Sequence, residues 1–575
     1  MALSRRILRR PLTTPPERLP KGLPPVLQRV YAARAIESAT DLDYSLERML
    51  PPERLGGLAP AVDLLAQAVE AGWRMVVVGD FDADGATSCA LCLRALRGMG
   101  AAHVDYLVPN RFEYGYGLTP EIVAVAAMRR PDLLITVDNG ISSLAGVAAA
   151  RELGIRVLIT DHHLPGASLP PANAIVNPNL YAEGSPGKHL AGVGVAFYVM
   201  LALRAELRSR GWFIRRNLAE PNLGQLLDLV ALGTVADVVP LDHNNRLLVH
   251  QGLQRIRAGR CLPGVRALLE IGGRTPARAV AADLGFAIGP RLNAAGRLED
   301  MALGIECLLA DSEADARRMA TRLDALNRDR KDIEAGMQAQ ALAAVEALAR
   351  DTRELPAGLC LYDPQWHQGV IGILASRIKE RFHRPVIAFA SAGNGELKGS
   401  ARSVPGLHIR DVLDAIATRH PGMLSRFGGH AMAAGLTLDE DRHLAFAEAF
   451  TAEVSRTLSD EDLQGVIPTD GQLLDEEFSL ATAKMLRDAG PWGQGFPAPR
   501  FDGMFTVLEQ RVVGERHLKM ILKPSGINRR LDGIAFNTGN SPATVGETRL
   551  VYRLDVNEYR GVESAQLIIE HMETD

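Results

Sequence analysis

The chain has 575 residues, of which 47% are hydrophobic and 23% are charged, and its formal net charge at pH 7 is -4. This length predicts three or four domains, and the composition is that of a soluble globular protein with sizeable cores. No apolar run reaches the roughly 20 residues that a membrane span needs, and a polyanionic partner would have to be bound by local basic patches.

The cysteines indicate a reducing compartment. Five of them are scattered along the chain, an odd count that does not suit a disulfide framework. Cys89 and Cys92 form a CxxC without a second pair nearby, which favours a buried structural pair over a zinc or redox site. We therefore expect a cytoplasmic protein.

The N-terminal segment MALSRRILRRPLTTPPERLPKGLPP is rich in Arg and Pro and lacks the apolar core of a secretory signal. An organelle presequence and a nucleic-acid contact stay open as alternatives. We expect a solvated arm that packs loosely on the first domain, and we assign residues 1–50 to this arm and its lead-in.

Residues 51–310 alternate apolar strand-like runs with helical patterns, which predicts an α/β domain with a parallel sheet. The expected strands cover residues 75–78, 104–108, 133–137, 157–159 and 174–176. Polar residues follow each of these strands. Because ligands of open α/β sheets bind outside the carboxyl ends of the strands, we expect these residues to converge on one site.

The first polar cluster is GDFDADG, in which Asp80, Asp82 and Asp84 occupy every second position. In an extended chain all three would share one face, and such crowded carboxylates must be protonated or neutralised, most simply by a divalent metal. Two other interpretations remain. A calcium-binding EF-hand loop would need a preceding helix and a Glu at its twelfth position, where this chain has Leu91. A structural turn would use Gly85 for an unusual backbone angle.

Later strand ends supply further candidate ligands. Asp138 follows the third strand, and His162 and His163 follow the fourth. A carboxylate-rich set with imidazole favours manganese or magnesium. Adjacent histidines on an extended segment point to opposite sides, so we expect at most one of them to bind a metal directly. Asp237 lies in the apolar run LVALGTVADVVPL, where an unpaired charge is costly, and it should have a metal or basic partner.

Three further segments complete the chain. Residues 311–355 predict a long connecting helix or helix pair, because residues 311–350 contain no Pro and one Gly. Residues 356–458 begin again with a strand pattern, LCLYD, and a helix from Gly369. Residues 459–575 hold five short strand patterns separated by turns, which predicts a small β-barrel such as an OB-fold.

Several motifs resemble those of a known family. GDFDADG, TVDNG, TDHH and GTVADVVPL are similar, in order and spacing, to the motifs of the DHH phosphoesterase superfamily and its RecJ branch. The resemblance continues through PNRFEYGYGL, AGVGVAF and GPRLNAAGRL, and through QGVIGILASRI, GSARS and FGGHAMAAG of the associated DHHA1 domain. It implies a parallel-sheet DHH domain and a smaller α/β DHHA1 domain, joined by a long helix and followed by an OB-fold barrel.

The resemblance also implies a function. RecJ proteins are exonucleases that degrade single-stranded DNA from the 5′ end with manganese or magnesium, in recombination and mismatch repair. The implied ligands of a two-metal site are Asp80, Asp82, Asp84, Asp138, His162 and Asp237. Asp138 is the expected bridge, and Val78 stands where related phosphoesterases place a His. Water activated by paired cations would be the nucleophile, and His163 is expected to meet the phosphate or assist the leaving group.

The same resemblance implies contacts to DNA. The expected binders of the backbone or the 5′ phosphate are Arg111, Tyr114, Arg291, Asn293, Ser376, Arg377, Ser400, Arg402, Gly429 and His430. Phe112, Tyr114 and Tyr116 can stack on bases, although Phe112 suits core packing equally well. Weaker candidates on the barrel are Arg511, Arg516, Lys519 and Tyr559.

The expected partner is single-stranded DNA, with a helicase and a single-strand-binding protein as candidate protein partners. Two alternatives remain open. One is a phosphoesterase acting on small oligonucleotides or cyclic dinucleotides, and the other is a non-catalytic DNA-binding scaffold.

Overall fold

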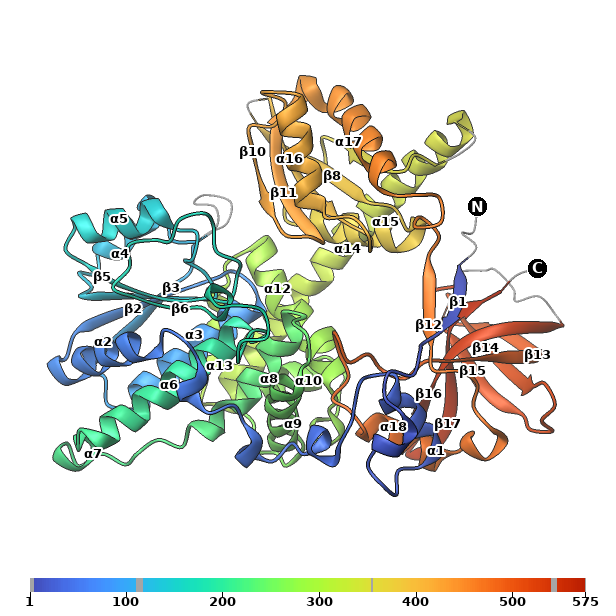
Figure 1. Ribbon diagram of the computed structural model, residues 1–575, viewed down its shortest axis with the longest axis horizontal. Coiled ribbons are helices and arrows are strands. Elements are labelled where there is room, and N and C mark those ends of the chain that lie inside the picture. Colours follow the sequence, from blue (N-terminus) through green and yellow to red (C-terminus); the bar gives the residue numbers. More distant parts are fainter. Residues whose placement is uncertain are drawn as a thin grey trace. The chain divides into compact units, whose positions relative to one another are not determined.

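The computed structural model describes residues 5–109, 117–352, 355–393, 395–514, 516–538 and 546–573. The chain divides into two compact units. One comprises Met1–Arg10, Arg328–Thr469 and Glu573–Asp575, and the other comprises Pro11–Asn327 and Asp470–Met572. Each unit is coloured by sequence in Figure 1. None of the helices in the described ranges combines the length and apolar character of a membrane span.

A parallel sheet of order β3-β2-β4-β5-β6 organises the larger unit. Its strands are β2 (Arg74–Gly79), β3 (His103–Leu107), β4 (Leu133–Val137), β5 (Arg156–Thr160) and β6 (Ala174–Val176). The five strands predicted from the sequence are confirmed to within one residue at every end. Alternation along β2 sends Met75 and Val77 to one hydrophobic core and Val76 and Val78 to another, so helices cover both faces.

The helices of these two layers are distinct. The core around Met75 and Val77 is shared by α2 (Leu58–Ala71), α3 (Ala83–Gly98) and α6 (Gly192–Ser209), and the opposite core by α4 (Pro120–Ala127) and α5 (Leu144–Glu152). Cys89 and Cys92 lie buried and unbonded to each other in α3, as expected of a structural pair. A helical layer follows, with α8 (Leu227–Ala236), α9 (His243–Arg257), α10 (Pro263–Ile271), α12 (Gly289–Leu298) and α13 (Ala302–Leu309).

The predicted connecting segment is one continuous helix, α14 (Glu313–Thr352), of 40 residues. It runs from the larger unit into the smaller one, since the division falls between residues 327 and 328.

The smaller unit contains a mixed sheet of order β10-β11-β9-β8-β7. Its strands are β7 (Leu359–Tyr362), β8 (Val386–Gly393), β9 (Glu396–Arg402), β10 (Arg426–Gly429) and β11 (Ala433–Asp439). Only β7 and β8 pair in parallel. One core contains α15 (Ile371–Phe382) with part of α14, and the other contains α16 (Ile409–Arg419) and α17 (His443–Thr457).

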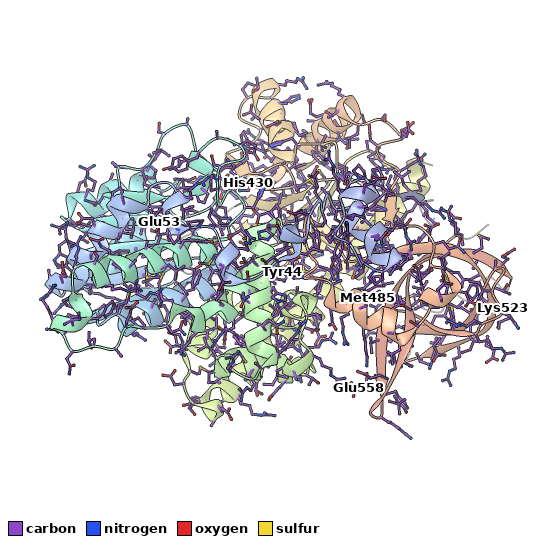
Figure 2. All side chains as sticks on the ribbon, turned by 60° about the horizontal axis from the view of Figure 1, so that its bottom comes forward. Tyr44, Glu53, His430, Met485, Lys523 and Glu558 are labelled. Atoms are coloured by element: carbon purple, nitrogen blue, oxygen red, sulfur yellow. The ribbon has the colours of Figure 1, made fainter. Side chains whose placement is uncertain are left out.

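The C-terminal segment forms a closed five-stranded barrel, as predicted. Its strands are β13 (Phe501–Val513), β14 (His517–Pro524), β15 (Leu531–Ala535), β16 (Glu547–Tyr559) and β17 (Val562–Met572). β15 and β17 pair in parallel and the other neighbours are antiparallel. Figure 2 labels Met485 on α18 (Leu480–Asp488), which packs on β16 and β17, and Lys523 and Glu558 on the barrel.

The expectation of a loosely packed N-terminal arm is wrong. Within the smaller unit, β1 (Arg6–Arg9) pairs in parallel with β12 (Val466–Thr469). Within the larger unit, the Arg34 guanidinium donates two hydrogen bonds to the Asp470 carboxylate, at 2.8 and 3.0 Å, and both side chains are buried. The backbone of β12 needs a hydrogen-bonding partner along its edge, and the arm supplies it despite its many arginines.

Candidate metal centre

The aspartate cluster joins the end of β2 to the start of α3. β2 ends at Gly79, Asp80 follows it directly, and α3 already begins at Ala83. Asp82 is the N-cap, and its Oδ1 accepts hydrogen bonds from the backbone N–H groups of Asp84 (2.9 Å) and Gly85 (3.0 Å). The predicted extended stretch is therefore wrong, because carboxylate capping of the helix N-terminus prevails over period-two alternation.

The two alternative interpretations of this cluster also fail. A strand and not a helix precedes it, which excludes the EF-hand loop. Gly85 has no positive φ, so it does not provide an unusual backbone angle. A Cβ at this position would lie 2.5 Å from the Asp80 carbonyl oxygen, so the glycine provides space for a close approach of the backbone.

Asp84 is buried and held by the first turn of α6. Its two carboxylate oxygens accept hydrogen bonds from the backbone N–H groups of Gly192 (2.6 Å) and Val193 (3.0 Å). Burial, together with repulsion from Asp82, raises the pKa of Asp84 to about 7, although the two hydrogen bonds act to lower it. A positive charge near this carboxylate would offset the cost of ionising it.

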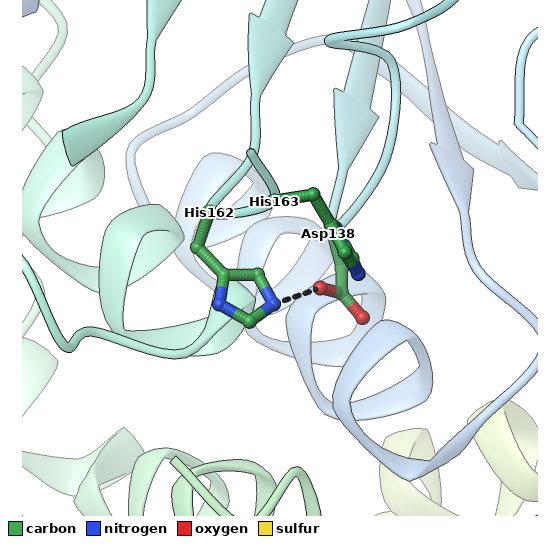
Figure 3. A group of neighbouring side chains, drawn as sticks. All are labelled: Asp138, His162 and His163. Carbon is green, nitrogen blue, oxygen red and sulfur yellow. Dashed lines mark ion pairs between the residues drawn. The ribbon is translucent and has the colours of Figure 1, made fainter. Parts of the chain in front are cut away.

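Asp138 and Asp237 approach the same imidazole. Nε2 of His162 lies 3.1 Å from Oδ1 of Asp138, the pair drawn in Figure 3, and 3.4 Å from Oδ2 of Asp237. Burial, followed by the charges of Asp84 and Asp82, raises the pKa of Asp138 well above its usual range. The pKa of Asp237 is raised by the same causes. Cations are the simplest neutralisation for this many carboxylates.

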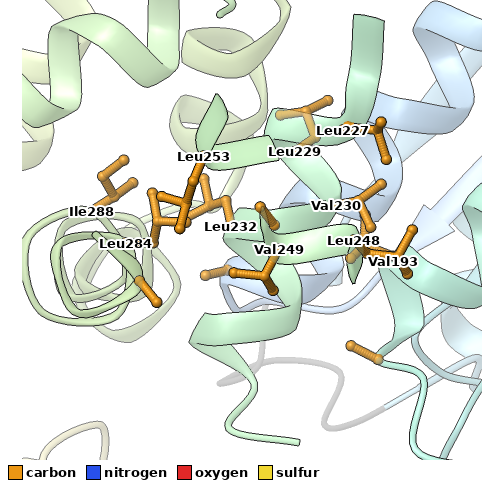
Figure 4. Packing of buried hydrophobic residues seen from close by; sticks show 14 of the residues in the cluster. Val193, Leu227, Leu229, Val230, Leu232, Leu248, Val249, Leu253, Leu284 and Ile288 are labelled. Carbon is orange, nitrogen blue, oxygen red and sulfur yellow. The ribbon is translucent and has the colours of Figure 1, made fainter. Parts of the chain in front are cut away.

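A residue with positive φ lies at one of these acids and directly after the other. Asp138, directly after β4, has φ +62°, in the left-handed region. Asp237 is the C-cap of α8, and the next residue, Val238, also has φ +62°, which is unusual for a β-branched side chain. α8 is buried from Leu227 to Thr234 and packs against α9 and the π-helix Leu284–Ile288 (Figure 4). This packing fixes the end of α8 that carries Asp237.

The two histidines do not point to opposite sides, so that expectation is wrong. Their ring centroids are 4.6 Å apart. The chain bends here because one oxygen of Asp161 accepts hydrogen bonds from the backbone N–H groups of both histidines. The same oxygen lies 2.7 Å from Nδ1 of His163. Burial acts to lower the pKa of His163, but the contact with Asp161 outweighs it and raises the pKa to about 9.

Three groups of side chains in the described ranges have ligand atoms within 4.8 Å of one another. They are Asp138 with His162 and His163, Asp84 with His162 and Asp237, and Asp80 with Asp82 and Asp138. The structure thus brings together all six residues expected to hold metals, and Asp138 belongs to two groups, as a bridging ligand would. An oxygen-rich donor set with imidazole fits manganese or magnesium.

Two residues of this centre were missed from the sequence as functional candidates. Asp161 fixes the ring of His163, and its position at a strand end beside the histidines was the available signal. Gly192 donates to Asp84 and leaves room for Asp138, because a Cβ there would lie 2.6 Å from Cβ and Oδ1 of Asp138. Its motif, AGVGVAF, was noticed, but spacing gave no indication of its contacts.

The expected DNA-binding residues of the larger unit have varied surroundings. Arg111 and Tyr114, with Phe112 and Tyr116, lie outside the described residues. Arg291 forms an ion pair with Asp324 of α14, with Nη2 and Oδ1 2.7 Å apart. The side-chain oxygen of Asn293 accepts a hydrogen bond from the backbone N–H of Ala83, at 2.7 Å.

In the smaller unit, Ser400 and Arg402 are neighbours on β9. Nη1 of Arg402 donates to Oγ of Ser400, at 3.0 Å, and burial lowers the pKa of Arg402. A Cβ on Gly372 of α15 would lie 2.9 Å from Nη2 of Arg402 and 3.0 Å from Oγ of Ser400, so this helix covers the pair closely.

The other expected binders of this unit lie on α15 and at the end of β10. Ser376 donates to the backbone oxygen of Gly372, at 3.1 Å, one turn along α15. Arg377 pairs instead with Glu334 of α14, with Nε and Oε1 3.0 Å apart. Gly429 has φ +147° at the end of β10, and the following residue, His430, is exposed and is labelled in Figure 2.

Comparison with known families accounts for most of the chain. The DHH family, N-terminal domain, matches residues 74–234, the DHHA1 domain matches residues 356–459, and the RecJ OB domain matches residues 469–571. These matches coincide with the parallel sheet, the mixed sheet and the barrel.

Similar proteins extend over nearly the whole chain. Single-stranded-DNA-specific exonuclease RecJ of Escherichia coli (strain K12) is 58% identical over 96% of each chain. The protein of the same name from Dickeya dadantii (strain 3937) is 59% identical over 96% of this chain and 97% of its own length. The crystal structure of RecJ in complex with Mn2+ from Thermus thermophilus has a TM-score of 0.80 at 31% identity, covering 99% of this chain and 79% of that one. The chain therefore belongs to the RecJ family of single-stranded-DNA-specific exonucleases.

Proposed function

We propose that the chain is a metal-dependent exonuclease that hydrolyses the phosphodiester bonds of single-stranded DNA from the 5′ end, in DNA recombination and repair. The observation that carries this proposal is the convergence of five carboxylates and an imidazole, from four separate segments, on one buried centre. The name of the relatives supports the choice of DNA as substrate.

The proposed cofactor is a pair of Mn2+ or Mg2+ ions. Solved RecJ structures from Thermus thermophilus are complexes with Mn2+ and with Mg2+, which supports both choices. The proposed ligands are Asp80, Asp82, Asp84, Asp138, His162 and Asp237. When bound, paired divalent cations activate a water and neutralise the charge that develops on the leaving oxygen.

The protein's own contribution is to hold its ligands rigidly. The N–H groups of Gly192 and Val193 fix both oxygens of Asp84, so this carboxylate keeps one orientation. Asp82 and Asp138 are fixed by helix capping and by a strained backbone, respectively. Preorganised ligands of this kind need little rearrangement when the reaction begins.

His163 is proposed to contact the scissile phosphate or to assist the leaving group. Its Nδ1 lies 2.7 Å from an oxygen of Asp161, which fixes the orientation of the ring at the edge of the proposed metal site. We expect His163→Ala to lose most of the turnover while Mn2+ binding is retained, and His162→Ala to lose both. Full turnover by His163→Ala would exclude this role.

The DNA strand is proposed to be held at its backbone by Ser400 and Arg402, with Ser376, Arg377, Gly429 and His430 nearby in the same domain. Arg111, Tyr114, Arg291 and Asn293 are the proposed contacts from the DHH domain. On the barrel, Arg511 and Lys519 are cross-strand neighbours of β13 and β14, where two cations suit a phosphate backbone.

The decisive experiment uses single-stranded oligonucleotides labelled at either end. With Mn2+, we expect a 5′ label to appear first as a mononucleotide and a 3′ label to shorten stepwise, with duplex left intact. Cleavage of small dinucleotides only would favour the alternative phosphoesterase. Absence of any Mn2+-dependent release would favour a non-catalytic scaffold.

The proposal extends to the cellular setting. Five free cysteines agree with a reducing compartment such as the cytoplasm. A helicase and a single-strand-binding protein are proposed partners, because an enzyme restricted to single strands needs its substrate to be unwound and kept accessible. Faster degradation of duplex when a helicase is added would support this.

A further inference from the structure

Helix α12 lies directly against the aspartate loop of the metal centre. Oδ1 of Asn293 accepts a hydrogen bond from the backbone N–H of Ala83, at 2.7 Å. One turn further along the helix, a Cβ on Gly296 would collide with the carbonyl oxygen of Phe81. Since Phe81 and Ala83 flank Asp82, α12 contacts the backbone on both sides of this proposed ligand.

The hydrogen bond to Asn293 gives the backbone N–H of Ala83 an acceptor that helix α3 itself cannot supply. The first N–H groups of an α-helix lack intrahelical acceptors, and Ala83 is the first residue of α3. Oδ1 of Asp82 already accepts hydrogen bonds from the backbone N–H groups of Asp84 and Gly85. Among the described residues, no hydrogen bond uses Oδ2 of Asp82. By accepting the third donor, Asn293 leaves this second oxygen available to a cation.

The position of α12 is itself fixed by α14. Arg291, two residues before Asn293, pairs with Asp324 at 2.7 Å, and both side chains are largely buried. Glu299, at the C-terminal end of α12, pairs with Arg322 at 2.7 Å. These two ion pairs anchor both ends of α12 to the first part of the long helix.

We propose that Asn293 is a positioning residue of the metal centre, which acts through the backbone of Ala83 to hold Asp82 and Asp84 in ligand geometry. This inference rests on the proposed metal-dependent function. The positioning role uses the side-chain oxygen of Asn293 as a hydrogen-bond acceptor. A contact with phosphate would instead use the side-chain nitrogen of Asn293 as a donor. The two roles therefore lie on different atoms and are separable by substitution.

The test compares Asn293→Ala with Asn293→Asp in the full chain. Alanine removes the acceptor, whereas aspartate keeps an oxygen for Ala83 and removes the amide donor. Titration calorimetry with MnCl2, without DNA, measures the metal affinity. We expect Asn293→Ala to bind Mn2+ about 10- to 100-fold more weakly, as is usual when a group that orients a ligand is lost. We expect Asn293→Asp to recover most of the affinity.

Two further variants make the result specific. Asn222→Ala removes a comparable side-chain acceptor, to the N–H of Gly224 at 3.1 Å, on an exposed turn, and should leave Mn2+ affinity unchanged. Gly296→Ala should weaken Mn2+ binding by displacing Phe81, without altering any side-chain donor to DNA. It provides an independent answer if Asn293→Ala does not fold, which thermal unfolding in EDTA establishes.

The outcomes separate this inference from the proposed function. If the wild-type chain binds no Mn2+, the proposed metal centre fails. If the wild type binds Mn2+ but Asn293→Ala binds it equally well, only the positioning role is overturned. A raised KM for single-stranded DNA, with unchanged Mn2+ affinity in Asn293→Ala and Gly296→Ala, would likewise overturn it.

Discussion

Replacement of Gly192 by alanine is expected to inactivate the enzyme without unfolding it. The added Cβ would lie 2.6 Å from Cβ and Oδ1 of Asp138, whereas ordinary van der Waals contact begins at 3.4 Å. Asp138 must therefore retreat by roughly 0.8 Å, and a displacement of about 1 Å at a catalytic centre costs on the order of 100-fold in rate. We expect a loss of this size in turnover at saturating Mn2+.

The fold should tolerate the same substitution. Gly192 is the first residue of α6 and has no positive φ, so alanine fits the backbone there. The remaining cost is the roughly 1–3 kcal/mol of overpacking, which a domain of this size can absorb.

The assay measures nucleotide release from single-stranded DNA alongside thermal unfolding in EDTA. Gly336→Ala is the matched control, because Gly336 lies in α14 with nothing within 4 Å of the added Cβ. This control should retain full activity. Full turnover by Gly192→Ala, with Asp138 in its original place in a crystal structure, would contradict this prediction.

Two other predictions concern charge. Asp138→Asn should lower turnover about a thousandfold, because a shared metal ligand contributes several kcal/mol to the reaction. The unfolding temperature in EDTA should stay equal or rise, because one of the crowded carboxylates is removed. A lower unfolding temperature would contradict this prediction. Arg34→Ala should cost about 3–5 kcal/mol in the free energy of unfolding, because it leaves the buried Asp470 carboxylate unpaired. The exposed ion pair of Arg6 with Glu461 should contribute at most about 1 kcal/mol to the free energy of unfolding, measured by denaturant titration. Equal losses of this free energy in Arg34→Ala and Arg6→Ala would contradict the prediction that the buried pair contributes more.

The sheet and the general location of the metal centre could be predicted from the sequence. Runs such as MVVVG and LLITV are almost entirely apolar and fully buried, because both faces of the parallel sheet are covered. Because the carboxyl ends of parallel strands lie at the same edge of a sheet, the polar residues that follow these strands were expected to meet there. The barrel was also predictable, because its short strand patterns are separated by turns, and strands such as β14 and β15 alternate buried and half-buried positions.

Local geometry around the ligands was not predictable in the same way. Asp80, Asp82 and Asp84 have the spacing of a strand, but Asp82 caps a helix that begins at the next residue, Ala83. The histidine pair likewise bends because Asp161 accepts both of its backbone N–H groups. In both cases a side chain competes with the regular backbone pattern, and the spacing of residues does not reveal which of them prevails.

Some contacts between distant segments could not be predicted from the sequence. The contribution of Gly192 depends on the space beside Asp138, which only the packed structure defines. The buried pair of Arg34 and Asp470 joins residues 436 positions apart, and an isolated arginine near the N-terminus is more often exposed. The assignment of the N-terminal arm failed for this reason.

We propose that side chains from separate segments form one site for two cations. Anomalous scattering from a crystal of the full chain grown with Mn2+ tests it most directly. We expect two peaks, both next to the Asp138 carboxylate, with Asp237 and His162 contacting one of them. A single peak away from Asp138, or ions bound elsewhere in the DHH domain, would contradict the account.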